Sequence, residues 1–224
     1  MQKKERALHI VEALELQYPE AECSLNSGSA LELLIATRLS AQCTDARVNL
    51  VSPELFKKYI TVQDFADADP EAVGRIIYSC GFYKTKSKDI VNMCKMIISK
   101  YNGKVPDTIE DLVKLPGVGR KTANLIVGDI FGKPSYVVDT HCIRITNLLG
   151  LTDSKDPVKI ENQLRELIPP ERSGIFCHRL VFHGRSVCKA RHPECLRCCI
   201  SQWCDCADFS ENKKTKYISE KILS

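Results

Sequence analysis

The stretch Leu115–Ala123 reads LPGVGRKTA, and it decides how this part of the chain folds. Pro116 ends the preceding helical segment, because a proline ring cannot continue a helix. Gly117 and Gly119 allow backbone conformations that other residues avoid. An apolar pattern with helical spacing resumes after the second glycine. The sequence therefore predicts two helices joined by a tight Gly-Val-Gly hairpin.

The start of the second helix is the chemically useful part of this hairpin. The first backbone N–H groups of a helix lack partners within the helix and carry partial positive charge, which suits a phosphate. Arg120 and Lys121 add two cationic side chains beside them. The stretch is not a nucleotide-binding P-loop, because Arg120 interrupts the Gly-Lys-Ser/Thr triplet of that motif. Taken alone, Gly-x-Gly is more typical of a plain turn between helices.

The rest of the chain is also predicted to be helical. Apolar residues recur with helical spacing, and Gly, Pro, Asn and Asp separate the segments. The only short β-like patch is Ser135–Val138. The predicted helices cover residues 4–17, 29–40, 44–59, 70–78, 86–101, 108–115, 119–131, 140–149, 157–168 and 174–183, and Leu8, Val11 and Leu14 form the apolar stripe of the first. The predicted fold class is all-α.

Length and composition set outer limits. With 224 residues, 44% of them hydrophobic and 27% charged, the chain is expected to fold and not to be disordered. The net charge of +4 fits a nucleic-acid partner only if basic residues cluster in space. No apolar run near the N-terminus is long enough for a signal peptide or a membrane span, so we expect a cytoplasmic protein, associated with the nucleoid if bacterial. The polar tail after Cys206 is expected at the surface.

The cysteines are unevenly distributed. Six of the twelve are scattered among apolar residues, where a small buried side chain is expected, and the other six fall between Cys188 and Cys206. Without an export signal, metal binding is favoured over disulfides. The spacing C-x6-C-x2-C-x5-C is formed by Cys188, Cys195, Cys198 and Cys204. Four thiolates suit zinc or an iron cluster, and the spacing alone does not choose between them. Cys199 and Cys206 are additional.

Two further residues lie where helices begin. Lys121 falls in the first turn of the helix after the hairpin, where an amine can contact a phosphate or act as a nucleophile that forms a Schiff base. Asp139, in SYVVDTHCIRI, precedes an amphipathic pattern and is predicted to be a helix N-cap. A cap and a catalytic role are compatible, because capping fixes the orientation of the carboxylate.

Taken together, LPGVGRKTA, the Val-Asp-Thr-His segment at 138–141 and the four-cysteine spacing resemble the endonuclease III family of helix–hairpin–helix glycosylases. The resemblance extends from the N-terminal helix to about Asp208. It implies two helical lobes with a DNA-binding cleft between them. Residues 22–134 would form a six-helix bundle that carries the hairpin, and residues 1–21 with 135–224 would form a lobe that carries an iron–sulfur cluster loop.

The resemblance also implies catalytic roles. Lys121 would attack the sugar C1′ of a damaged nucleotide and form a Schiff base with it. Asp139 would stabilise positive charge at the sugar and assist proton transfers. The four spaced cysteines would hold a [4Fe-4S] cluster that orders their loop, and Cys199 and Cys206 are left outside this ligand set.

DNA contacts follow from the same resemblance. The damaged base must leave the stack, and Gln42 of LSAQCTD would fill the space it vacates. Locally, a turn with Thr44 or Asp45 as a helix cap explains that segment equally well. In GFYKTKSKDI, Gly81 and Lys84 or Lys86 would contact the DNA backbone, although a basic, solvated loop fits the same residues. The expected DNA-binding residues are Gln42, Lys84, Gly117, Gly119, Arg120 and Arg185.

The implied function is that of a bifunctional DNA glycosylase and abasic-site lyase of base excision repair. It would act as a monomer on double-stranded DNA with damaged bases or abasic sites, remove oxidised or ring-saturated pyrimidines, and cleave by β-elimination. The alternatives are a related mismatch or photodimer glycosylase and a non-catalytic, cluster-bearing DNA-binding module. Lys121 argues against adenine-removing relatives, which usually lack the hairpin lysine. The presence of both Lys121 and Asp139 argues against the non-catalytic module.

Overall fold

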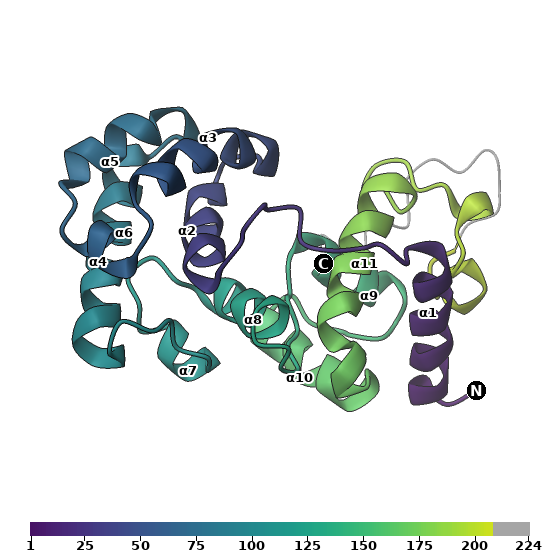
Figure 1. Cartoon of the computed structure of the whole chain (residues 1–224). Coiled ribbons are helices and arrows are strands. Elements are labelled where there is room, and N and C mark those ends of the chain that lie inside the picture. The colour runs from purple at the N-terminus through teal and green to yellow at the C-terminus, as the bar shows by residue number, and fades with distance from the viewer. Residues whose placement is uncertain (208–224) are drawn as a thin grey trace. The chain divides into compact units, whose positions relative to one another are not determined.

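The computed structural model describes residues 1–207 (Figure 1). Every regular element in this part of the chain is a helix, so the predicted all-α class is confirmed. Among the residues described, no helix combines the length and the apolar character needed to span a membrane. Most of the tail that was predicted to lie at the surface, residues 208–224, is outside the described residues.

The chain separates into two compact units. One unit is continuous and runs from Cys23 to Lys133, and the other combines Met1–Glu22 with the chain from Pro134 onward. The bundle expected from the family resemblance, residues 22–134, spans the continuous unit with one further residue at each end.

The continuous unit is a bundle built around α2 and α6. Its elements are α2 (Ala30–Ser40), α3 (Asp45–Lys58), α4 (Val62–Ala66), α5 (Pro70–Ile76), the 3-10 turn η1 (Tyr78–Cys80), α6 (Tyr83–Tyr101), α7 (Ile109–Leu112) and α8 (Arg120–Asp129). The long helix α6 packs against α4 and α5, and α2 packs against α3, α6 and α8 (Figure 1). Leu34, Ile90 and Ile126, from α2, α6 and α8, are fully buried and belong to its core.

Side-chain caps fix where several of these helices begin. Ser29 accepts a hydrogen bond from the backbone amide of Glu32 at the start of α2. Thr44 does the same for the amide of Arg47 at the start of α3, so of the two residues predicted as the cap, Thr44 or Asp45, it is Thr44. Each cap satisfies an amide that has no partner within the helix and contributes about 1 kcal/mol.

The second unit carries the remaining helices. They are α1 (Lys3–Gln17), α9 (Thr140–Leu148), α10 (Pro157–Leu167), α11 (Ser173–Ser186) and the 3-10 turns η2 (Pro170–Arg172), η3 (Cys195–Arg197) and η4 (Ser201–Trp203). α11 packs against α9 and α1, and α1 also packs against α10. The buried stripe of α1 consists of Ala7, Ile10, Val11 and Leu14. Leu8, predicted on this stripe, is only half-buried, because it lies about 100° around the helix from Ala7.

Several predicted boundaries differ from the structure. The helix predicted over 108–115 ends at Leu112, and Pro116 explains part of this difference because a residue before proline avoids the helical conformation. The helix predicted over 86–101 begins earlier, at Tyr83. α4 was missed, although its Thr61–Asp64 capping box is a signal that the sequence carries. The β-like patch Ser135–Val138 is buried but is not a strand.

Candidate functional site

The predicted hairpin lies between α7 and α8 in the continuous unit. Gly117 has φ +75°, in the left-handed region that favours glycine, and Gly119 is the extended N-cap of α8. Arg120 and Lys121 occupy the first turn of α8, and both are exposed. Two exposed cations therefore lie at the positive end of a helix, an arrangement that attracts phosphate.

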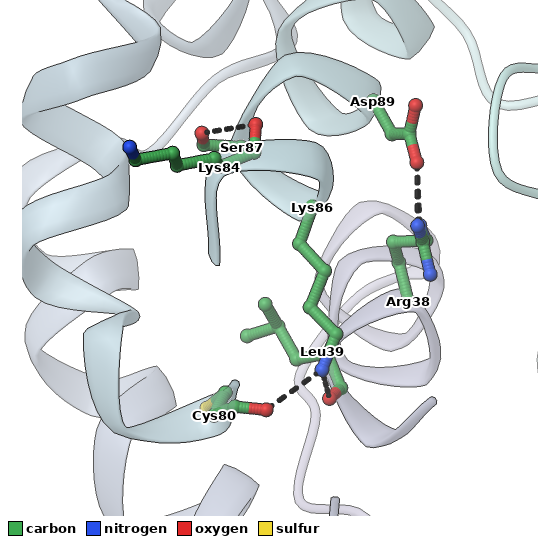
Figure 2. Close-up of polar contacts among 7 residues, drawn as sticks. All are labelled: Arg38, Leu39, Cys80, Lys84, Lys86, Ser87 and Asp89. Atoms are coloured by element: carbon green, nitrogen blue, oxygen red, sulfur yellow. Dashed lines mark hydrogen bonds and ion pairs between the residues drawn. The ribbon is translucent and has the colours of Figure 1, made fainter. Parts of the chain in front are cut away.

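Gly117 packs against an ion pair that joins two other helices. Arg38 of α2 donates two hydrogen bonds, of 2.9 and 2.6 Å, to one carboxylate oxygen of Asp89 in α6 (Figure 2). A Cβ on Gly117 would lie 2.6 Å from Arg38 Nε and 3.1 Å from Asp89 Oδ2. Glycine is therefore required at this position by close packing as well as by its backbone angle.

Gln42 lies in the short loop between α2 and α3. It is exposed, and its φ of +54° puts a non-glycine residue in the left-handed region. Such a conformation costs on the order of 1 kcal/mol and occurs preferentially at functional sites. Among the described residues, the other non-glycine residues with positive φ are Phe82 and Asn102. Asn102 caps the C-terminus of α6, where this conformation is ordinary.

Phe82 was not singled out by the sequence. It is the N-cap of α6, has φ +48°, and exposes 66% of its surface. An exposed aromatic ring on a strained backbone is an unusual combination, and only the structure reveals it. Lys84, in the first turn of α6, is also exposed and lines a surface hollow together with Arg75 and Lys88.

The assignment of Lys86 to the DNA backbone is wrong, and so is the interpretation of its segment as a solvated loop. Lys86 lies inside α6, is only 1% exposed, and donates hydrogen bonds from Nζ to the backbone carbonyls of Leu39 and Cys80 (Figure 2). The error has a physical cause. Three lysines at alternate positions after Gly81 are typical of a loop. Here one of them, Lys86, is directed into the bundle.

Asp139 begins α9 in the second unit. Its Oδ1 accepts a hydrogen bond of 2.8 Å from the amide of Cys142, so the predicted N-cap is confirmed. The residue is half-buried, and the cap holds its carboxylate in a defined orientation relative to α9. Arg185 belongs to the same unit, where it is exposed in the last turn of α11.

The C-terminal cysteines gather around one pocket in the second unit. The residues that line it are Leu148, Val187, Cys188, Pro193, Glu194, Cys195, Cys198, Ser201, Cys204, Cys206 and Ala207. All four cysteines of the C-x6-C-x2-C-x5-C spacing are among them, and so is Cys206, whereas Cys199 is not. In the part of the chain that the structure describes, no group of three or more His, Cys, Asp or Glu side chains is arranged to hold a metal ion.

Arg144 and His183 each lie beside one of the cysteines that line this pocket. Arg144 donates a hydrogen bond of 3.4 Å to Cys188 Sγ, and His183 Nε2 lies 3.4 Å from Cys198 Sγ. Burial raises the pKa of the Cys198 thiol to about 12 and that of Cys204 to about 11. Such thiols ionise readily only beside a strong positive charge, which is the environment that a bound metal provides.

Contacts from α1 hold the cysteine segment in place. Arg6 forms an ion pair with Asp205, and the ring of His9 stacks on Trp203 with 5.7 Å between ring centroids. Asp205 and Trp203 flank Cys204. The N-terminal helix is therefore part of the framework around the pocket.

Comparisons with known proteins identify the family of this chain. Residues 35–170 match the family model of the HhH-GPD superfamily of base excision DNA repair proteins. The chain is 43% identical to the endonuclease III of Synechocystis sp. over 93% of this chain and 95% of that protein. It is 45% identical to the endonuclease III of Bacillus subtilis over 84% of this chain and 86% of that protein.

A solved structure gives the same result. The chain is similar to a trapped endonuclease III–DNA covalent intermediate, with a TM-score of 0.85 and 41% identity over 92% of this chain and 98% of that one. The chain belongs to the endonuclease III family of the HhH-GPD superfamily of base excision DNA repair proteins.

Proposed function

We propose that this protein is a bifunctional DNA glycosylase and abasic-site lyase that removes oxidised or ring-saturated pyrimidines from duplex DNA. The observation that carries the proposal is the position of Lys121. It presents an exposed amine in the first turn of α8, directly after the Gly117–Gly119 hairpin. A relative with 41% identity was trapped as a covalent DNA intermediate, and a lysine amine is a nucleophile that forms such an adduct.

The proposed chemistry takes place at the sugar C1′. Lys121 Nζ forms a bond to C1′, the bond from C1′ to the base breaks, and the base leaves with its electron pair and a proton. The sugar ring opens to a Schiff base, which makes a C2′ proton acidic. Loss of that proton expels the 3′ phosphate by β-elimination. Asp139, held by its cap, stabilises positive charge at the sugar and moves protons.

The DNA contacts are proposed residue by residue. Amides at Gly117 and Gly119 and the side chain of Arg120 hold a phosphate beside Lys121. Gln42 fills the space of the flipped nucleotide, and its strained, exposed position supports that role. Lys84 and Arg185 contact the DNA backbone. The protein acts as a monomer on damaged double-stranded DNA, in the cytoplasm.

We further propose that a [4Fe-4S] cluster is held by Cys188, Cys195, Cys198 and Cys204. Their convergence on one pocket and the sulfur-only donor set support this assignment. When bound, the cluster would order the loop that carries its ligands. Cys206 also lines the pocket. The spacing found in the family is the reason for choosing Cys204 over Cys206.

A cleavage assay with labelled DNA tests the proposal. Duplexes carry one oxidised pyrimidine, one mismatched thymine, one pyrimidine photodimer or one preformed abasic site, each in the same sequence. We expect release of the oxidised pyrimidine and a β-elimination end at both that site and the abasic site. Preferential cleavage of the mismatch or photodimer duplex would support the alternative glycosylases. Binding without any cleavage would support the non-catalytic module.

A further inference from the structure

A buried lysine lies beneath the loops that carry the strained residues of the continuous unit. Lys86 is 1% exposed, although lysine is almost never fully buried unless its charge is satisfied. Its Nζ donates hydrogen bonds of 2.7 Å to the carbonyl of Leu39 and 2.8 Å to the carbonyl of Cys80. Figure 2 shows the ammonium group at the end of a side chain that reaches both oxygens. Removing a charge from water is costly, and an apolar side chain often fills such a position at no loss of stability.

The two carbonyls belong to the chain segments that lead into the two strained residues. Leu39 is in the last turn of α2, where backbone carbonyls lack helical partners, and Gln42 follows three residues later. Cys80 ends η1, and Phe82 follows two residues later. Gln42 and Phe82 are both exposed and both have positive φ. The buried ammonium group of Lys86 therefore holds the segments that precede both loops.

A second contact joins α2 and α6. Arg38 precedes Leu39 in α2, and Asp89 follows Lys86 by three residues in α6, so the Arg38–Asp89 ion pair runs beside the Lys86 contacts (Figure 2). The side chains of this ion pair are mostly buried, with 17% and 25% exposure. Gly117 of the hairpin packs directly on Arg38. The contacts that fix α2 and α6 relative to each other therefore also contact the hairpin that precedes Lys121.

We propose that Lys86 is a positioning residue for damaged DNA. It fixes the Gln42 loop and the Phe82 loop in position relative to each other, and it acts through these loops without touching DNA. The inference rests on the proposed function, because its consequence is expressed in the recognition of damage. A residue that only stabilised the fold would change how much protein is folded. A positioning residue also changes how well the folded protein distinguishes damaged from undamaged DNA.

Three variants of the full chain test this. Lys86→Met removes the charge and both hydrogen bonds while keeping an unbranched side chain, and Lys86→Arg keeps a cation and donors but moves them. Lys95→Met is the matched control, because Lys95 is exposed on the same helix. For each variant, the ratio of affinities is measured for a duplex with a stable abasic-site analogue and for the same duplex without damage. The single-turnover cleavage rate and the melting temperature are recorded in parallel.

We expect Lys86→Met to lower the affinity ratio about tenfold and the cleavage rate by about ten- to a hundredfold, since small misplacements of contact groups have effects of this size. Affinity for undamaged DNA should change little, because exposed phosphate-contacting cations are untouched. Lys86→Arg should fall between Lys86→Met and the wild type. Lys95→Met should match the wild type in both ratio and rate.

Each outcome of this experiment either supports or contradicts the positioning role of Lys86. A folded Lys86→Met variant with the wild-type ratio and rate contradicts the positioning role. If that variant does not fold, Lys86→Arg decides instead, and a wild-type ratio there contradicts the proposal. If the wild type itself neither prefers the abasic analogue nor cleaves damaged DNA, the proposed function fails first, which separates the two failures.

Discussion

Gly117 and Arg38 are in direct contact, so that a single methyl group on Gly117 would come within 2.6 Å of Arg38 Nε. The contact joins the hairpin before α8 to the C-terminal part of α2 and, through Asp89, to α6. This contact therefore joins three segments that are far apart in sequence and that carry proposed DNA contacts. Their relative positions within the continuous unit depend on it.

Substitution of Gly117 by alanine should destabilise the protein. The new Cβ meets the strained φ of +75° and the Arg38 side chain, and we expect a loss of about 2 kcal/mol in the free energy of unfolding. Gly119→Ala is the matched control, because its φ is −96° and a Cβ there would meet no atom of the described residues within 4 Å beyond its chain neighbours and its own helix. That variant should lose about 1 kcal/mol or less. Chemical denaturation measures both, and equal losses would contradict the packing argument.

Two substitutions at Asp139 separate its capping from its chemistry. Asparagine caps helices as well as aspartate does, so Asp139→Asn should leave the melting temperature near that of the wild type. The same variant should cleave at least about a hundredfold more slowly, because an amide neither stabilises positive charge nor carries protons. Asp139→Ala should lose about 1 kcal/mol of stability in addition. Near-normal cleavage by a folded Asp139→Asn variant would contradict the catalytic role.

The cysteine pocket makes a prediction about iron. Cys188→Ser should lose bound iron and sulfide, because Cys188 lines the pocket and belongs to the proposed ligand set. Cys199→Ser should retain both, because Cys199 lies outside the pocket lining. Iron and sulfide analysis of the purified variants, with Cys204→Ser and Cys206→Ser alongside, checks the assignment. Loss of the cluster in Cys206→Ser together with retention in Cys204→Ser would exchange those two residues in the ligand set.

Lys86 should give the protein a distinctive pH dependence. Burial lowers its pKa, the electrostatic influence of Cys43 and Cys80 opposes that shift, and Arg38 adds to it. In the unfolded chain a lysine titrates near about 10.4. Between the two pKa values the unfolded chain binds more protons than the folded chain, so stability rises with pH in that window and is lost as pH falls toward the folded pKa.

Comparison with Lys86→Met isolates this effect. The stability of the wild type minus that of the variant should increase as pH rises from the lowered pKa of the folded protein toward about 10. The exposed Lys95→Met substitution should show no such trend. Melting temperatures across this range measure the difference, and a difference for Lys86→Met that is independent of pH would show that the lysine titrates normally.

Much of the fold was predictable because it depends on local patterns. Helical spacing and breaker residues located most of the helices within a few residues. Residue type alone predicted Asp139 as a cap and narrowed the cap of α3 to Thr44 or Asp45. The missed helix α4 carries a local capping signal, whereas the misplaced start of α6 depends on a tertiary contact. α6 begins at Tyr83 in a segment whose charges suggest a loop, because Lys86 finds carbonyl partners from α2 and η1.

The site divides in the same way. Lys121, Asp139 and the four cysteines stand in motifs that can be recognised from sequence, and their roles remain proposals. Phe82 and Gln42 differ, because a positive φ in a residue other than glycine arises from the packing around it. The contact between Gly117 and Arg38 joins residues far apart in the chain, so no local pattern in one sequence predicts it.

The most direct test of the proposed chemistry is a borohydride trapping experiment on Lys121. The protein is incubated with duplex DNA that contains one thymine glycol, borohydride is added, and covalent protein–DNA complexes are resolved, with Lys121→Ala alongside. We predict a covalent complex for the wild type and none for the variant, because borohydride reduces the proposed Schiff base to a stable bond and the variant lacks the amine that forms it. A complex that persists in Lys121→Ala, or no complex with either thymine glycol or a preformed abasic site, would contradict the role of Lys121 as nucleophile.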